Sequence, residues 1–230
     1  MLAATLLLCA VPLFAQRTPL TPYEYGHRWY FVFQGGPLYF SSEYNGNLIA
    51  EGRIGELFSV GAGLGMGYNI TDAHEIRFIG NYSRKTAVCE PYIPDVDDLS
   101  DVSVTTYTYK FRTINFFADY LLNYNALAEN FVPFTAKIYG GLGFGYSYDF
   151  TEPGNPEVWV RDPNLVPGLN LGFILEYDFK DGFGLYSDLG AAVYYDRYNG
   201  IAPIGFPLDL EAYLQVGLIY HFPLKKTGRR

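Results

Sequence analysis

Cysteine, positive charge and long apolar runs are all scarce in this chain. Only two cysteines occur in its 230 residues, and Cys9 lies in an apolar segment at the very start. If that segment is removed, Cys89 is alone and no intramolecular disulfide can form. The formal charge of -8 argues against a nucleic-acid partner, because phosphates are bound by clustered Lys and Arg. After residue 15, no apolar run approaches the roughly 20 residues of a membrane-spanning helix.

Aromatic residues and glycine, by contrast, are abundant. The chain contains 22 Tyr, 18 Phe and 25 Gly, whereas only 17% of its residues are charged. Its length suits one domain with a sizeable core. The composition therefore indicates a single β-domain that is rich in aromatic side chains.

The first 15 residues, MLAATLLLCAVPLFA, are predicted to be a signal peptide, since they form an apolar run of the right length. A retained membrane anchor is the alternative, because no Lys or Arg precedes the run and Leu13 stands where a small residue is expected. Removal of residues 1–15 would leave 16–27 as a periplasmic N-terminal segment.

Eight segments with strand character follow, and their connections are alternately short and long. NITDA, NYNALAEN and KDG are short, while the other connections are longer and rich in Gly, Pro, Asn and Asp. Short turns on one rim and long loops on the other are typical of outer-membrane barrels. The sequence therefore predicts an all-β fold, an eight-stranded antiparallel up-and-down transmembrane β-barrel over residues 28–222, with long loops extracellular and both termini periplasmic. The expected strands lie near 28–41, 55–69, 73–88, 104–122, 132–149, 165–179, 183–197 and 208–222.

The two faces of the strands differ in polarity, and this difference indicates whether lipid or water surrounds the barrel. Along 134–148, one face is apolar without interruption, over a length that crosses a bilayer core. A soluble lipocalin-like barrel is the rival, with its apolar face turned inward. Its outer surface would then be the glycine-rich face of 55–69, which is poorly suited to water. The pattern favours lipid outside and glycine inside, where glycine makes room for long side chains.

Segment 104–122 does not keep one pattern along its whole length. Ile114 and Phe116 face lipid, but the same phase places Lys110 and Arg112 outward and Phe111 inward. A bulge near Arg112 would restore the pattern, or the strand leaves the bilayer there. The sequence leaves both possibilities open.

The last expected strand carries a pattern of its own. A polar residue, a glycine and two aromatic residues follow one another at fixed spacing: Gln215, Gly217, Tyr220 and Phe222. This pattern resembles the β-signal, by which the barrel assembly machinery recognises the last strand of its substrates. Residues 223–230 then form a basic tail, expected to be solvated in the periplasm.

The whole predicted mature chain resembles the small OmpA-type and PorT-like outer-membrane barrels of the Bacteroidota. The stretches GAGLGMGYNIT and YGGLGFGYSYDF are the features that carry this resemblance. It implies a location in the outer membrane of a Gram-negative cell, in contact with its lipid. PorT-like relatives further imply an accessory role in a secretion machine, whereas the residues after Phe222 are too few for a peptidoglycan-binding domain.

Charged residues on the polar faces are predicted to fill the lumen. Five of them lie at comparable depth on successive strands: Arg77, Asp119, Lys137, Glu176 and Asp188. In a barrel of about eight strands, side chains fill the interior. Ion pairs among these residues would plug the barrel, since unpaired buried charges are costly. An ion-selective constriction is the alternative.

Neither catalytic nor metal-binding residues can be assigned from the sequence, and no cofactor is expected. His27, His74 and His221 all map to the periplasmic rim, far from the long loops, which argues against a histidine-based hydrolase. The acidic loop 94–101 lacks the glycine and the final glutamate of a calcium loop. Trp159, on a long loop, is a possible contact for another envelope protein or packs against neighbouring loops. The function hypotheses are a structural or partner-binding role without enzyme activity, an accessory secretion subunit, and a narrow solute channel.

Overall fold

A computed structural model describes residues 29–41, 54–89, 107–127, 134–151, 163–179, 182–195, 197–200 and 208–222. The predicted signal peptide, the segment 16–27, the acidic loop 94–101, Trp159 and the tail 223–230 lie outside these residues. Within the described ranges, no helix is long and apolar enough to cross a membrane.

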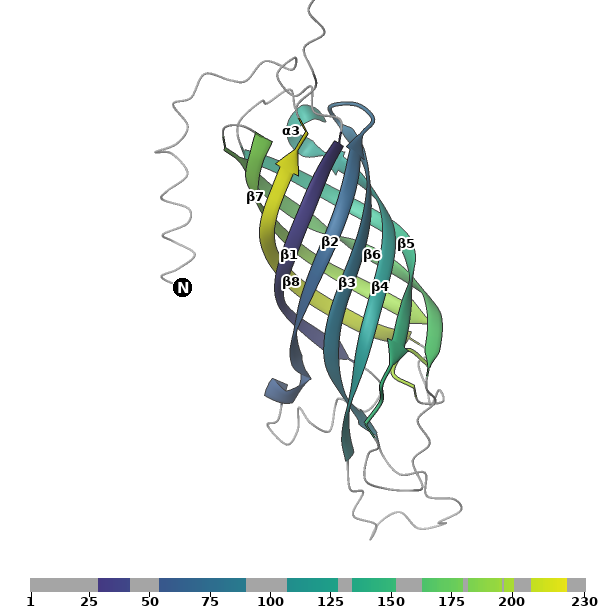
Figure 1. Ribbon diagram of the computed structural model, residues 1–230. Helices are drawn as coiled ribbons and strands as arrows, with labels where there is room; N and C mark the ends of the chain where they lie inside the picture. Colours follow the sequence, from purple (N-terminus) through teal and green to yellow (C-terminus); the bar gives the residue numbers. More distant parts are fainter. Residues whose placement is uncertain are drawn as a thin grey trace, which may run out of the picture.

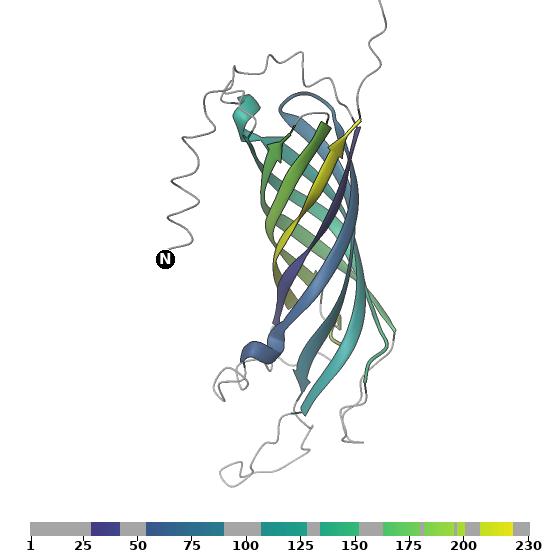
Figure 2. The same ribbon diagram turned by 60° about the vertical axis from the view of Figure 1, so that its left-hand side comes forward.

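Eight strands close into one barrel in which each strand is antiparallel to both of its neighbours (Figures 1 and 2). The first and last strands pair from Tyr30 with His221 to Ser41 with Leu210. The predicted fold is confirmed, and every strand begins and ends within a few residues of its expected bounds. The strands are β1 Trp29–Ser41, β2 Phe58–Asn69, β3 His74–Cys89, β4 Tyr107–Asn123, β5 Phe134–Tyr148, β6 Asn164–Asp178, β7 Phe183–Tyr195 and β8 Leu208–His221.

The two rims differ as the connection lengths predict. At the short-turn end, uppermost in Figure 1, residues 70–73 join β2 to β3 and the short helix α3 (Tyr124–Leu127) follows β4. The amide of Phe222 donates to the Trp29 carbonyl over 2.9 Å. This hydrogen bond joins the end of β8 to the start of β1 at the short-turn rim. The opposite rim, the long-loop end, carries the 3-10 helix η2 (Ile54–Leu57) before β2.

Side chains alternate between the inside and the outside of the barrel along each strand, since successive Cβ atoms point to opposite faces. On the outside, Val60 and Leu64 of β2 and Leu142 of β5 are 74%, 68% and 68% exposed. Their inward neighbours Gly61, Gly63 and Gly65 are buried. An apolar surface this extensive is what a bilayer requires, and monomers in water rarely expose one.

Strand β4, for which the sequence allowed either a bulge or an exit from the bilayer, runs without a bulge. β3 and β4 pair in one continuous register from His74 with Leu122 to Cys89 with Tyr107. β2 pairs with β3 only as far as Ser83, and β5 with β4 only as far as Arg112. Beyond those points β3 and β4 form a two-stranded ribbon that extends past the barrel wall at the long-loop end (Figure 1).

The ribbon explains why the polarity of β4 changes. Tyr109 and Phe111 are buried on its inner side, where the Phe111 ring stacks on Phe150 at 5.1 Å. Lys110 and Arg112 are exposed on its outer side, and Arg112 Nε lies 2.9 Å from Asp149 Oδ2. The bulge near Arg112 is therefore wrong: the phase is kept, and the charged outward residues begin where the ribbon leaves the wall.

Candidate functional site

Buried charged side chains and tyrosines gather in the interior of the barrel. Inward positions on β3 through β8 carry buried charges and tyrosines, because each strand keeps its two-residue period through the wall. They form three groups along the axis, named here the short-turn cluster, the middle cluster and the long-loop cluster.

The middle cluster is centred on Arg77, whose side chain is fully buried. Its Nη2 lies 2.6 Å from Asp119 Oδ2, and its Nη1 lies 2.9 Å from Asp188 Oδ2. Tyr139 donates its hydroxyl to Asp188 Oδ1 over 2.8 Å, and the guanidinium lies 4.5 Å from the Tyr139 ring centroid. Tyr186 also hydrogen-bonds Arg77. The two carboxylates thus share one guanidinium, and hydrogen bonds from Tyr139 to Asp188 and from Asn170 to Asp119 add to the ion pairs.

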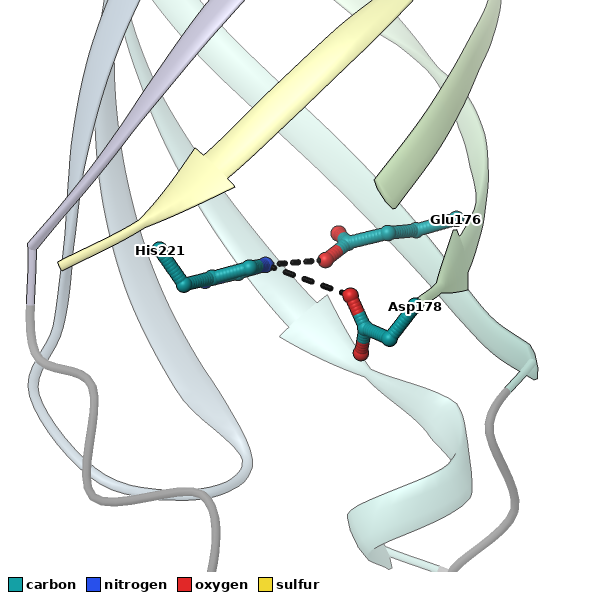
Figure 3. A group of neighbouring side chains, drawn as sticks. All are labelled: Glu176, Asp178 and His221. Atoms are coloured by element: carbon teal, nitrogen blue, oxygen red, sulfur yellow. Dashed lines mark hydrogen bonds and ion pairs between the residues drawn. The ribbon is translucent and has the colours of Figure 1, made fainter. Parts of the chain in front are cut away.

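The short-turn cluster contains Glu75, Lys137, Glu176, Asp178 and His221. Lys137 Nζ lies 2.8 Å from Glu176 Oε2 and 3.0 Å from Glu75 Oε1. On the other side of Glu176, its Oε1 lies 2.5 Å from His221 Nε2, while Asp178 Oδ1 lies 3.5 Å from the same nitrogen (Figure 3). Carboxylates outnumber the lysine in this group.

The long-loop cluster surrounds Lys85 with aromatic rings and one carboxylate. Lys85 Nζ pairs with Glu211, donates to the Tyr198 hydroxyl over 2.6 Å, and lies 4.4 Å from the Tyr198 ring centroid. Burial raises the pKa of Tyr198, in the turn after β7, so its hydroxyl stays protonated. That hydroxyl donates to Asn115 Oδ1 over 2.7 Å, and the ring stacks on Tyr194 with centroids 4.0 Å apart.

The structure places the five lumen residues expected from sequence in two groups. Arg77, Asp119 and Asp188 lie together in the middle cluster, whereas Lys137 and Glu176 belong to the short-turn cluster. Among the described residues, sequence reasoning did not assign five buried acidic, basic or histidine side chains to the lumen: Glu75, Lys85, Asp209, Glu211 and His221. Glu75 and Lys85 share the odd-numbered inward phase of Arg77 on β3, so the strand period alone contained the signal for them.

The residues of the predicted assembly signal divide between the two faces of β8. Gln215 is buried in the lumen and hydrogen-bonds Gln34 across the β1–β8 seam. Tyr220 and Phe222 lie on the outer side, with ring centroids 5.1 Å apart. Their recognition by the assembly machinery stays a prediction.

The closed antiparallel wall, the apolar outer surface and the filled polar interior define the chain as an eight-stranded up-and-down transmembrane β-barrel. Among solved structures, it is similar to a major outer membrane protein of Thermus thermophilus, with 14% identity and a TM-score of 0.50 over 85% of this chain and 100% of that one. It also matches Neisserial surface protein A, with 15% identity and a TM-score of 0.45 over 84% of this chain and 97% of that one.

The likeness to the Thermus thermophilus protein shows the fold and nothing finer, because the identity is only 14%. No model of a known protein family matches the chain, and no curated protein matches it. The comparisons give no support to the more specific PorT-like resemblance within the Bacteroidota.

Proposed function

We propose that this chain is a non-enzymatic outer-membrane protein whose lumen is plugged by ion pairs and whose role is structural or partner-binding. The observation that carries the proposal is the burial of every cation in the three clusters. The side chains of Arg77, Lys85 and Lys137 are 0%, 0% and 4% exposed, and each contacts a carboxylate. An ion crossing the lumen would have to break these contacts, which are strong where water is excluded.

The orientation belongs to the same proposal. The long-loop end would be extracellular and present Trp159 to another envelope protein, while both termini would be periplasmic. The barrel would be inserted by the assembly machinery through the pattern Gln215, Gly217, Tyr220 and Phe222. An accessory subunit of a secretion machine is the specific partner-binding form of this role, and it rests on the PorT-like resemblance alone.

The described histidines support a role without catalysis. His74 Nδ1 lies 2.6 Å from the Tyr120 hydroxyl on the outside of the barrel, and His221 lies against two carboxylates. Neither arrangement joins a histidine to a serine or cysteine, as nucleophilic hydrolysis requires.

Conductance in a planar lipid bilayer tests the plug. The purified barrel should produce no stepwise current under a salt gradient, while a general porin reconstituted in the same way serves as the positive control. Reproducible single-channel steps from the wild-type chain would contradict a plugged lumen and indicate a narrow solute channel.

Partner binding is tested separately, by purifying the full chain from its native outer membrane in mild detergent and weighing the eluted complex. A companion at fixed stoichiometry is expected for the partner-binding role, and its loss on Trp159→Ala would assign the contact to that loop. A lone monomer would leave a structural role.

A further inference from the structure

Three side chains meet at one point of the short-turn rim. Glu176 and Asp178 are two positions apart on β6, so both point to the inner side of the wall, and His221 is the last residue of β8. β7 lies between these two strands in the sheet. The three side chains therefore converge across the start of β7 from strands that do not pair with each other (Figure 3).

Their separations suit a small metal ion. One ligand atom from each residue, His221 Nε2 and one oxygen from each carboxylate, lies within 4.8 Å of the other two. In a tetrahedral zinc site, bonds of about 2.0–2.2 Å place neighbouring ligand atoms roughly 3.3–3.6 Å apart. Nε2 and Asp178 Oδ1 are 3.5 Å apart already, and Nε2 and Glu176 Oε1 need to separate from 2.5 Å as the ion replaces the hydrogen-bonded proton.

Two further observations point to a cation. The Oδ1 atom of Asp178 is buried and accepts no hydrogen bond from the described residues, although it faces the histidine. The short-turn cluster holds three carboxylates and one lysine: Lys137 pairs with Glu75 and Glu176, and among the described residues His221 is the only basic side chain within 4 Å of Asp178. Excess buried charge is costly, and a divalent ion would neutralise it.

We propose that Glu176, Asp178 and His221 form a site for a divalent first-row metal ion, with Zn²⁺ as the representative occupant. One imidazole nitrogen and two carboxylate oxygens are ordinary zinc ligands, and a water from the rim would complete the tetrahedron. Lys137 would hold the second oxygen of Glu176, 2.8 Å away, and so orient the oxygen that faces the metal.

The bound ion would link β6 to the end of the closing strand β8. Because the site exists only in the closed barrel, metal binding would stabilise the folded state in proportion to the logarithm of the free metal concentration once the site is saturated. This inference is independent of the proposed plug and of any partner.

The test uses the full-length barrel in detergent micelles, free of polyhistidine tags and stripped with chelator. Titration with Zn²⁺ alone, followed by calorimetry and by the thermal unfolding midpoint, should show one saturable site and a rise in the midpoint. His221→Gln and Asp178→Asn should each weaken Zn²⁺ binding by more than about tenfold, because even the loss of a hydrogen-bond partner of a metal ligand has an effect of that size. His74→Gln is the matched control, since His74 lies at the same rim but on the outside, and it should bind Zn²⁺ as the wild type does.

Co²⁺ provides a second measurement that does not depend on stability. A wild-type chain with a tetrahedral site should give visible absorption bands on Co²⁺ addition, and Asp178→Asn, which keeps the side-chain shape, should lose them while its circular dichroism is unchanged. The proposal is overturned if the wild type shows no saturable Zn²⁺ binding, or if binding is the same in His221→Gln and Asp178→Asn as in the wild type.

Discussion

At the scale of single residues, Lys137 shows what burial demands of a charge. Its ammonium group satisfies two carboxylates that come from β3 and β6, and all three side chains are almost fully buried. Removing one member of a buried ion pair leaves the others as uncompensated charges, which costs more than the pair itself contributes.

Lys137→Met should therefore lower the free energy of unfolding by about 3–5 kcal/mol. Urea unfolding in lipid vesicles, followed by tryptophan fluorescence, measures the difference. Lys110→Met is the control, because Lys110 is exposed on the ribbon and a surface substitution should stay within about 0.5 kcal/mol. Equal effects of the two changes would argue against an energetic role for the short-turn cluster.

At the scale of elements, β2 shows why its inner face is built from glycine. Gly67 lies directly opposite Tyr30 of β1, and a Cβ atom at Gly67 would lie 2.0 Å from Tyr30 Cζ. The glycine thus makes room for a buried aromatic ring, which the strand pattern predicts only in general terms.

Gly67→Ala should destabilise the barrel by about 1–3 kcal/mol, since overpacking forces the Tyr30 ring out of its position. Gly140→Ala is the comparison: a Cβ there would approach only the Asn170 carbonyl oxygen, at 3.9 Å. Chemical unfolding of both variants under one set of conditions provides the measurement. Tyr30→Leu should restore stability to the Gly67→Ala chain, and failure of that rescue would show that the ring is not the cause.

The change of polarity along the β3–β4 ribbon could be explained only once the pairing of its strands was known. Its strands keep one phase throughout, and its polarity changes because the neighbours β2 and β5 stop pairing at Ser83 and Arg112. The length of a neighbour's ladder is not encoded in the strand itself, so the sequence of 104–122 left two explanations open.

At the scale of the whole molecule, the outer surface predicts how the barrel responds to charge at different depths. Leu142 lies at the middle of β5 and is 68% exposed. Leu142→Arg should cost about 2–4 kcal/mol in a bilayer, the usual cost of a lipid-facing arginine near the midplane.

Thr108→Arg supplies the matched substitution, because Thr108 is exposed on the ribbon beyond the wall. Its cost should fall to about 0–1 kcal/mol, as for positions near the interface. Unfolding free energies in phospholipid vesicles separate the two, and similar costs would contradict a bilayer around the wall.

The sequence by itself determined the eight strands, their bounds to within a few residues, the alternation of short and long connections, and, outside the first half of segment 104–122, the face on which the strand side chains lie. These features follow from a period of two residues and from turn composition, which are local properties of the chain. The inward position of Arg77 was therefore predictable, and so were those of Glu75 and Lys85.

Only the tertiary structure decided which charges meet. Asp119 is the direct cross-strand neighbour of Arg77, but Asp188 reaches the same guanidinium across the lumen from β7. His221 and Glu176 meet because β8 and β6 converge over the start of β7. Contacts across a barrel depend on its closure and on the stagger of its strands, which are properties of all eight strands together and of none alone.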